Sequence, residues 1–417
     1  MILDDVITAQ KKGEARGITS ICSAHPAVLQ AAMRQDGNLL IESTCNQVNQ
    51  FGGYTGMTPA DFVRFVEQMA EDNGFNPDKI ILGGDHLGPN VWQNEPADEA
   101  MAKSEVMMRA YLQAGFTKIH LDCSMRLRDD PPGLLDLEVS ARRSARLAKV
   151  AEESRVNQNE APRYVVGTEV PVPGGATEHE DGVSATRIED LEQTIDCTRR
   201  AFKEADIESA WERVIAVVVQ PGVEFGDDFI QDYDRRKAAA LSGYIEIQPI
   251  VYEAHSTDYQ TPGALRNLVE DHFAILKVGP ELTFAYREAV FALSMMEDAL
   301  LPLDERSNFI RVLDNVMLAD PQYWQRYYHG DVQTIEFARK YSLSDRIRYY
   351  WHYPQVQSTL KILFTNLNAL VLPPGLVSQF APRQYDLYRD QKAGFTPQDL
   401  VRARINEVLQ KYAQACG

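Results

Sequence analysis

Eight short apolar segments rich in β-branched residues recur along the chain and constrain its fold more than any other feature. Helix-like stretches separate them. The segments are residues 18–22, 39–43, 80–84, 118–122, 164–169, 214–220, 250–255 and 274–279. Parallel strands that are buried on both faces read as continuous apolar runs, and their alternation with helices is typical of βαβ units. Eight such units predict an α/β fold of the (β/α)8 TIM-barrel type, with a doubly wound open sheet as the structural alternative.

The connecting stretches carry helical patterns, of which residues 59–74 and 97–115 are the clearest, each closed by a glycine. After about residue 285 the strand pattern stops, and the chain becomes helical and rich in aromatic residues. We therefore expect a barrel over residues 1–300 and a C-terminal helical extension, packed on the barrel, over residues 301–417.

The net charge of −18 argues against nucleic acid or an anionic membrane surface as the main partner, because both require basic patches. A small anionic substrate stays compatible, since a site can be locally positive on an acidic protein. The five scattered cysteines form no CxxC pair and indicate neither a disulfide framework nor a zinc finger. The sequence lacks a signal-peptide pattern and any membrane-spanning apolar run, so we expect a cytoplasmic protein.

Polar residues follow each predicted strand, at the barrel end where function is expected. Such side chains are costly to bury without partners, so they indicate either a site or a plug of mutual ion pairs in the barrel mouth. A long segment after the fifth strand, residues 169–193, is predicted to be a loop that covers the site. The candidate residues at the strand ends are His25, Glu42, Asn46, Gln47, Asp85, His86, Asp122, Glu169, Gln220, His255, Ser256, Asp258 and Lys277.

The Asp85-His86 pair carries the most specific signal among these residues. Adjacent side chains that leave a strand point in different directions, so an imidazole can face a metal while the carboxylate faces a substrate. Imidazole favours zinc, manganese or cobalt, and carboxylates complete such sites. The candidate further ligands are His255, Glu169, Asp122 and His25, whereas a hydrogen-bonded loop histidine is the structural alternative for His86. Because His120 lies within a strand, we expect a structural role for it, and we assign none to His179, His272, His329 and His352.

Lys277 is interpreted either as a phosphate ligand or as a Schiff-base lysine. Ser256, Thr257 and the glycine at 279 fit a phosphate cradle, since barrels often bind phosphate after strands seven and eight. The sequence contains no Walker-A motif and no kinase signature, which argues against an ATP-dependent kinase. It also lacks the GxGxxG fingerprint of dinucleotide-binding folds.

Long motifs along the chain resemble one known family. They are ICSAHP, IESTCNQVNQFGGYTGMTPADF, IILGGDHLGPN, KIHLD, GTEVPVPGG, VVVQPGVEF, VYEAHSTDYQ, HFAILKVGP and YSLSDRIRYYW. They closely resemble the GatZ/KbaZ family and follow that family's order from about residue 14 to residue 380. The resemblance implies a barrel of the class II aldolase type. It also implies one of two roles: a non-catalytic subunit of D-tagatose-1,6-bisphosphate aldolase that supports a separate catalytic chain, or a D-tagatose-6-phosphate 4-epimerase that forms D-fructose 6-phosphate. A kinase label used in the family conflicts with the absence of nucleotide motifs.

The resemblance also implies roles for particular residues. Class II aldolases place an Asp-His pair after the third strand, with the aspartate as acid/base and the histidine on zinc, and Asp85-His86 matches this pair. Glu169 and His255 fall on strands that carry further metal-site groups in such enzymes. Gln220 stands where a metal histidine is expected, which is a departure from the pattern.

From these observations we predict a metal-dependent ketose-phosphate 4-epimerase that uses retro-aldol chemistry. The C4 proton lies two carbons from the C2 carbonyl and is not acidic, and transient hydride removal would require NAD, for which the fingerprint is missing. The alternative is the non-catalytic aldolase subunit, and a third role is an independent aldolase. The predicted cofactor is a divalent metal, zinc before manganese, cobalt or nickel. The predicted partners are a phosphorylated ketose, an aldolase catalytic subunit and a second copy of this chain, with no nucleic acid and no membrane.

Each candidate residue receives one predicted role. The catalytic residues are Asp85, Glu42 and Asp122. The metal ligands are His86, Glu169 and His255. The substrate-binding residues are His25, Asn46, Gln47, Gln220, Ser256, Asp258 and Lys277.

Overall fold

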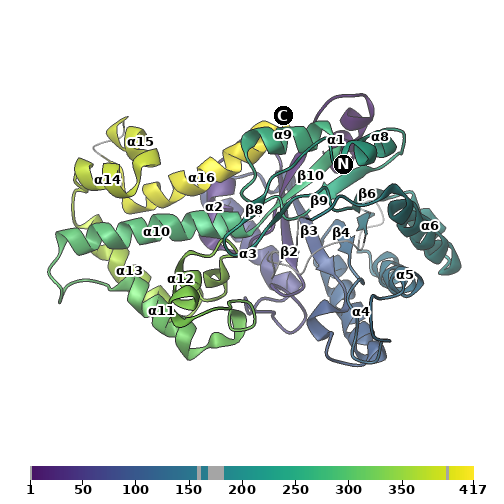
Figure 1. Ribbon diagram of the computed structural model, residues 1–417, viewed down its shortest axis with the longest axis horizontal. Coiled ribbons are helices and arrows are strands. Elements are labelled where there is room, and N and C mark those ends of the chain that lie inside the picture. Colours follow the sequence, from purple (N-terminus) through teal and green to yellow (C-terminus); the bar gives the residue numbers. More distant parts are fainter. Residues whose placement is uncertain (1, 157–160, 168–182, 391–393) are drawn as a thin grey trace.

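A closed barrel of eight parallel strands forms the centre of the protein (Figure 1). This computed structural model describes residues 2–156, 161–167, 183–390 and 394–417. The strands, in their order around the barrel, are β1 (Ile18–Ile21), β10 (Phe273–Val278), β9 (Val251–Ala254), β6 (Val214–Val218), β5 (Arg163–Val166), β4 (Lys118–Leu121), β3 (Ile80–Leu87) and β2 (Leu39–Thr44). The barrel prediction is confirmed, and each strand overlaps one predicted segment. The hairpin β7 (Glu224–Phe225) and β8 (Ile230–Gln231) lies outside the barrel.

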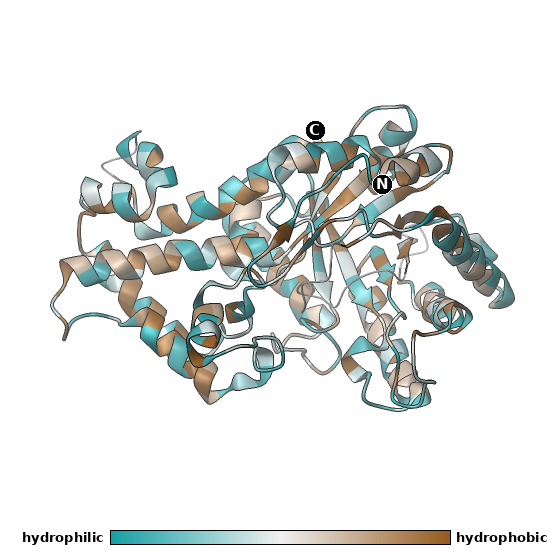
Figure 2. Ribbon diagram, viewed as in Figure 1, coloured by the Kyte–Doolittle hydropathy of each residue, from teal (hydrophilic) through white to brown (hydrophobic). Residues whose placement is uncertain are grey.

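Helices follow the strands and surround the barrel. They are α2 (Pro26–Ala32), α3 (Pro59–Asn73), α4 (Ala97–Gln113), α5 (Leu137–Glu153), α6 (Ile188–Glu204), α7 (Glu208–Trp211), α8 (Ala239–Glu246) and α9 (Pro262–Glu270). Helix α3 begins with a capping box formed by Thr58 and Asp61 and ends at Gly74, whose φ of 66° allows the left-handed cap. In Figure 2, hydrophobic residues lie along the barrel strands, whereas outer helices such as α6 are largely hydrophilic.

The predicted loop over residues 169–193 is shorter at its C-terminal end than expected, because α6 already begins at Ile188. Three acidic residues in and just after the first turn of α6 favour a helix start there, since they complement the helix dipole. Residues 168–182 lie outside the described residues. Glu169, a predicted metal ligand, and His179 therefore lie outside them too.

The end of the barrel that α1 (Ile2–Lys11) covers, opposite the C-terminal ends of the strands, is filled by apolar side chains. Helix α1 places Leu3 and Val6 against a separate apolar cluster that includes Leu40, Val165 and Val251. This end of the barrel interior is thus an apolar layer formed by α1 and the strands.

Strand β3 carries an irregularity at the residue pair that the sequence singled out. Its register with β4 shifts between Gly84 and Leu87, and His86 adopts a φ of 48°, in the left-handed region. A bulge of this kind breaks the normal alternation of side chains. Both Asp85 and His86 consequently lie in the barrel mouth, although neighbours on a regular strand would point to opposite faces.

The described part of the chain after β10 is helical. Its helices are α10 (Pro280–Leu300), α11 (Phe309–Ala319), α12 (Val332–Tyr341), α13 (Pro354–Asn368), α14 (Pro374–Phe380), α15 (Tyr385–Asp390) and α16 (Pro397–Cys416). Helix α10 extends away from the barrel, and α16 returns along it to pack against α9 and α2 (Figure 1). We keep the division into a barrel of residues 1–300 and an extension of residues 301–417 as a proposal.

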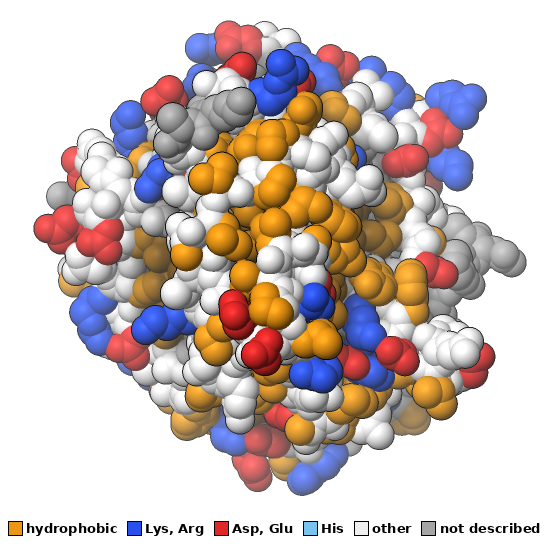
Figure 3. Space-filling model, turned by 90° about the vertical axis from the view of Figure 1, so that its left-hand side faces the viewer, with side chains coloured by type: hydrophobic (Ala, Val, Ile, Leu, Met, Phe, Trp, Pro, Cys, Tyr) orange, Lys and Arg blue, Asp and Glu red, His pale blue; other side chains and the backbone are white. Residues whose placement is uncertain are grey.

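Hydrophobic side chains gather on the end of the molecule that the extension forms (Figure 3). Exposed examples on its elements are Leu303, Ile362, Val371 and Leu387. Within the described residues, no helix combines the length and the apolar character that crossing a membrane would require.

Candidate active site

A buried layer of charged side chains lies across the middle of the barrel, directly above the apolar layer. The Lys118 ammonium sits 2.7 Å from Glu42 Oε1 and 2.6 Å from Glu253 Oε2, and all three side chains are fully buried. Ser20 Oγ donates a 2.8 Å hydrogen bond to Glu42 Oε1. Ion pairs of this kind are costly to desolvate, so they hold the barrel only while every partner is present. This layer corresponds to the ion-paired plug that was the structural alternative for the strand ends.

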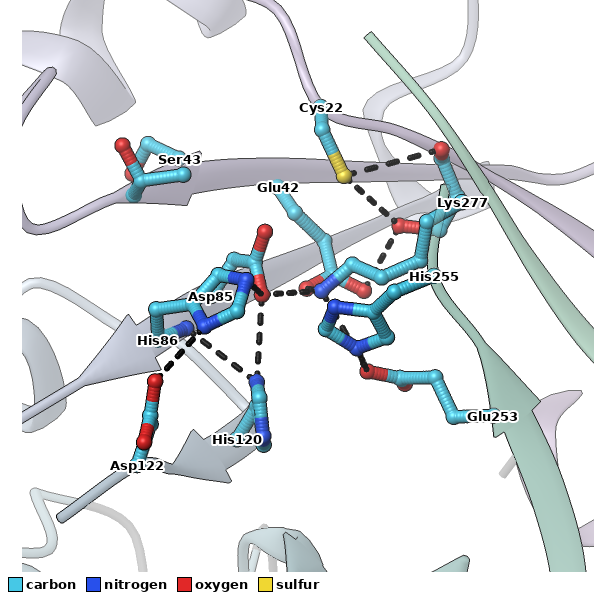
Figure 4. Close-up of polar contacts among 12 residues, drawn as sticks. Cys22, Glu42, Ser43, Asp85, His86, His120, Asp122, Glu253, His255 and Lys277 are labelled. Atoms are coloured by element: carbon cyan, nitrogen blue, oxygen red, sulfur yellow. Dashed lines mark hydrogen bonds and ion pairs between the residues drawn. The ribbon is translucent and has the colours of Figure 1, made fainter. Parts of the chain in front are cut away.

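Lys277 connects this layer to the barrel mouth (Figure 4). Its Nζ lies 3.2 Å from Glu42 Oε2 and 3.3 Å from Glu253 Oε1, and it also forms a short ion pair with Asp85. Burial disfavours the charged amine, but the carboxylates of Asp85, Glu253 and Glu42 raise the pKa of Lys277 well above its usual value. Lys277 is therefore a cation at neutral pH, and its charge faces these carboxylates.

Three histidine rings meet above the charged layer. The ring centroids of His86, His120 and His255 are 4.9, 4.8 and 5.1 Å apart, taken pairwise. Each of these residues and Asp85 offers one ligand atom, and the four atoms lie within 4.8 Å of one another. Figure 4 shows the three rings and the Asp85 carboxylate converging from β3, β4 and the end of β9.

Two carboxylates outside this group orient two of the rings. His86 Nδ1 lies 2.8 Å from Asp122 Oδ2, and His255 Nε2 lies 2.9 Å from Glu253 Oε1. The other nitrogen of each ring is therefore left for the cluster. A carboxylate behind an imidazole is the usual support of a metal-binding histidine, because it fixes the tautomer and raises the basicity of the ring.

His120 completes the set. Its Nδ1 lies 3.2 Å from Asp85 Oδ1, and its buried Nε2 has no hydrogen-bond partner among the described residues. When Nδ1 donates its proton to Asp85, the Nε2 lone pair is free to bind a cation. A buried polar atom without a partner is costly, so this atom points to a missing ligand.

The protonation states follow from burial and from the neighbouring charges. Burial would raise the pKa of Asp85, but His86 and the Lys277 ammonium lower it well below its usual range. Burial lowers the pKa values of His120 and His255, and Lys277 lowers them further. These two rings are therefore neutral at pH 7, which is the form that binds metal.

The composition of the cluster fits a divalent cation. Within the described part of the chain, the cluster contains two ammonium groups, those of Lys118 and Lys277, and four carboxylates, those of Glu42, Asp85, Asp122 and Glu253. Two negative charges are thus in excess before any imidazole is protonated. Nitrogen ligands from three imidazoles with one carboxylate favour zinc, manganese or cobalt over magnesium or calcium.

The structure brings together six of the predicted site residues and places the others around them. Glu42, Asp85, His86, Asp122, His255 and Lys277 belong to the cluster. Two of the others are engaged with backbone: Gln220 Oε1 accepts from the amides of Gly222 and Val223, and Asp258 Oδ1 accepts from those of Gly279 and Glu281. His25 and Gln47 line a neighbouring cavity, whereas Asn46 and Ser256 are only partly buried and are not among its lining residues.

Three residues of the site were not predicted from the sequence, namely Lys118, His120 and Glu253. The signal for His120 was present, because Lys118, His120 and Asp122 alternate along β4 and its end and share one face. The expected structural role for His120 rested on the assumption that this face turned outward. The structure turns it inward.

Comparison with known proteins identifies a family and supports the fold. The profile of the D-tagatose-1,6-bisphosphate aldolase subunit GatZ/KbaZ-like family matches residues 3–417. The D-tagatose-1,6-bisphosphate aldolase subunit GatZ of Salmonella heidelberg (strain SL476) is 50% identical over 419 residues, covering 99% of each chain. The subunit of the same name from Klebsiella pneumoniae subsp. pneumoniae is 50% identical over 420 residues, covering 100% of this chain and 99% of the relative.

A solved structure is similar over almost the same length. The crystal structure of "a probable tagatose 6 phosphate kinase from Sinorhizobium meliloti 1021" superimposes with a TM-score of 0.88 at 46% sequence identity, covering 96% of this chain and 100% of that one. The family profile and these relatives span nearly the whole sequence, so the match extends over both the barrel and the C-terminal extension. The chain belongs to the D-tagatose-1,6-bisphosphate aldolase subunit GatZ/KbaZ-like family.

Proposed function

We propose that this chain is a subunit of D-tagatose-1,6-bisphosphate aldolase and that its own barrel binds a divalent cation and a ketose phosphate. The names of the curated relatives support the subunit role, and they support it more strongly than the independent epimerase that the sequence analysis favoured. The observation that carries the metal and sugar part is the convergence of Asp85, His86, His120 and His255, with carboxylates behind two of the rings.

In this proposal the metal ligands are His86, His120 and His255, with Asp85 beside them. A divalent cation held there would supply Lewis-acid polarisation of the ketose oxygens. Asp122 and Glu253 keep His86 and His255 in the binding tautomer. Glu169 stays a proposed further ligand, and we retain Asn46, Gln47 and His25 as proposed contacts of the sugar hydroxyls.

A second candidate function is the 4-epimerase, which the position of Asp85 favours. The Asp85 carboxylate is ionised and lies at the barrel mouth, so it can accept the proton of the C4 hydroxyl. The C3–C4 bond then breaks, leaving an aldehyde at C4 and an enediolate on C1–C3. After the aldehyde turns over, the bond re-forms on its other face and Asp85 returns the proton to the C4 oxygen. We assign Lys277 the role of holding Asp85 in place, because its ammonium forms an ion pair with the Asp85 carboxylate. Glu42 in turn positions Lys277, whose Nζ lies 3.2 Å from Glu42 Oε2.

One experiment separates the candidate functions. The purified, metal-loaded chain is incubated alone with D-tagatose 6-phosphate and followed by proton NMR. Formation of D-fructose 6-phosphate that stops after chelation would establish the epimerase, and release of three-carbon products would establish an independent aldolase. No reaction alone, together with co-purification of an aldolase chain whose activity or half-life this chain increases, would establish the subunit role. Failure of both arms would refute the proposal.

Asp85→Asn tests the acid/base role directly. The amide cannot accept a proton but occupies the same space, so kcat/KM should fall about a thousandfold while zinc content is retained. Turnover is measured by the NMR assay and zinc by elemental analysis of the dialysed protein. Asp72→Asn, a change of the same kind on the exposed face of α3, should leave both quantities unchanged. Full activity of the Asp85 variant would disprove the assignment.

A further inference from the structure

A cavity of about 370 Å³ lies beside the charged cluster, where the ends of β1 and β10 meet the C-terminal extension. Its lining includes Cys22, His25, Gln47, Gly279 and Arg348. A volume of this order accommodates a small ligand such as a sugar phosphate. The cavity is thus formed jointly by the barrel mouth and by the extension.

The cavity adjoins the cluster through Cys22. Cys22, Glu42 and Asp85 offer atoms that lie within 4.8 Å of one another, and Cys22 Sγ lies 3.4 Å from the hydroxyl of Ser20. A ligand that fills the cavity therefore comes close to the Asp85 carboxylate at one point of its surface. A single ligand can consequently occupy the cavity and reach the cluster.

Arg348 is a cation on the cavity wall without a paired anion. Its guanidinium donates to the carbonyl oxygens of Ser344 and Asp345 and, at 2.8 Å, to Tyr349 Oη. Among the described residues, no carboxylate forms an ion pair with Arg348, and the nearby Asp345 carboxylate is paired with Arg287 at 3.1 Å. A largely buried guanidinium without a counter-ion is unfavourable, and its planar set of donors matches a phosphate group.

The other positive groups near the strand ends are already engaged. Lys277 faces Asp85, Glu42 and Glu253 inside the barrel and does not line the cavity. The first amides of α10, which often hold phosphate in barrels, donate instead to Asp258. The phosphate cradle expected from Lys277 and Ser256 therefore lacks its donors, and Arg348 is the cationic residue that faces the cavity.

We propose that this cavity binds the phosphate group of a phosphate monoester and that Arg348 is its anion ligand. This inference rests on the proposed ketose-phosphate ligand and adds the residue that distinguishes a phosphorylated sugar from a free one. It assigns the extension a part in ligand recognition, because Arg348 lies far beyond the last barrel strand. On an acidic protein, one unpaired arginine in a cavity is sufficient to make the site locally attractive to an anion.

The test is calorimetric binding of D-glucitol 6-phosphate to the full-length protein, with D-glucitol as the unphosphorylated control. This ligand has no carbonyl group and cannot be cleaved, so the result does not depend on turnover. Wild-type protein should bind the phosphate ester and not the free polyol at the same concentration. Arg348→Met should weaken binding about 10- to 100-fold, the range for a lost charged hydrogen bond. Arg348→Lys, which keeps the charge but not the planar donor set, should give an intermediate affinity.

Arg383→Met removes the same charge from an exposed position on the extension and should bind like wild type. Equal affinity of wild type, Arg348→Met and Arg348→Lys would overturn the inference, as would failure of the wild-type protein to bind the ester. Should Arg348→Met not fold, the Lys variant alone decides. If the wild-type protein binds no metal but Arg348→Met still weakens binding of the ester, the proposed metal chemistry is refuted and this inference stands. If the protein binds metal but its affinity for the ester does not depend on Arg348, only this inference is refuted.

Discussion

His120 is fully buried between Asp85 and the backbone of His86, and its Nδ1 lies 3.2 Å from Asp85 Oδ1 and 3.2 Å from the amide nitrogen of His86. A histidine that only filled space there would leave its Nε2 without a partner. The proposed metal site would supply a partner for this atom. We therefore treat His120 as the residue that best discriminates a metal site from a polar plug of the barrel.

We expect His120→Ala to lower zinc affinity at least about 100-fold, because loss of a ligand costs no less than loss of a supporting residue. Affinity is measured by competition with a chromophoric chelator. His329→Ala, which changes an exposed histidine of the extension, serves as the matched control and should bind zinc normally. Unchanged affinity in the His120 variant would remove it from the ligand set.

Asp258 provides a pH-dependent contribution to stability. Burial raises the pKa of this carboxyl to about 7, although the amides of Glu281 and Gly279 counteract the shift. The folded protein therefore holds this proton more tightly than the unfolded chain, whose carboxyl titrates near 3.8. The resulting stability is complete below about pH 4 and is lost as the pH rises through about 7.

Asp258→Asn should remove this pH dependence, because the amide oxygen can still accept the α10 amides but has no proton to lose. Relative to wild type, its free energy of unfolding should rise by about 1–3 kcal/mol between about pH 5 and pH 8. Urea titrations at several pH values measure this difference. A difference that stays constant across the range would show that Asp258 does not titrate there.

Residue types and strand ends were sufficient to predict that Asp85, His86 and His255 lie together, because side chains at the ends of parallel strands meet at one end of a barrel. Lys118 and Glu253 were assigned no role, because Lys118 stands at the start of its strand, away from the C-terminal ends where function is expected, and Glu253 precedes the more specific signal of His255. Arg348 was beyond prediction. It reaches the barrel mouth only through the path of the extension, which no local pattern encodes.

At the scale of single elements, β3 shows how a glycine, Gly83, makes room for the charged layer. A Cβ added to Gly83 would lie 2.6 Å from Glu42 Cγ and 3.3 Å from the Lys118 side chain. Both side chains are fixed by the buried ion pair and cannot move aside cheaply. The glycine at position 83 therefore reflects a packing requirement of the neighbouring strands.

Gly83→Ala should destabilise the protein by at least about 3 kcal/mol, because it forces a buried ion pair apart. Gly243→Ala is the control: the position lies within α8, where an added Cβ meets no atom within 4 Å. That variant should be up to about 1 kcal/mol more stable than wild type, owing to helix propensity. Thermal unfolding by circular dichroism measures both. Equal effects of the two changes would contradict this account of Gly83.

The barrel strands could be predicted to within a few residues because their apolar runs are uninterrupted. The end of β3 was predicted at residue 84, whereas the strand continues through the bulge to Leu87. Asp85 and His86 are polar, so hydropathy alone ends the strand before them. The bulge is associated with the left-handed conformation of His86, and the sequence pattern did not predict it.

On the scale of the whole molecule, the last helix completes the barrel wall. The amide of Gly17, just before β1, donates to the carbonyl of Cys416 at 2.8 Å, and Tyr412 Oη donates to the carbonyl of Thr257 at 2.7 Å. Helix α16 thereby ties the first strand to the loop after β9. The apolar residues that it buries include Leu400, Val401, Ile405, Val408 and Leu409.

A chain that ends at residue 395 should not fold cooperatively. Each of those side chains contributes about 1.5–3 kcal/mol when buried, and a whole domain is stable by only about 5–15 kcal/mol. We expect no sharp thermal transition and strong binding of a hydrophobic dye. A chain that lacks only Gly417 should unfold like wild type. A cooperative transition of the shorter chain at the wild-type temperature would contradict this view of α16.

The position of α16 also has a consequence for folding during translation. A ribosome adds about 5–20 residues per second, so roughly 20 s or longer separate the appearance of β1 from that of its last covering helix. The last barrel strand is complete at residue 278, well before α16 is made. In this interval the faces of α2 and α9 that α16 will cover are exposed. Until α16 has been made, this apolar surface is exposed, so the incomplete chain should aggregate more readily than the folded protein.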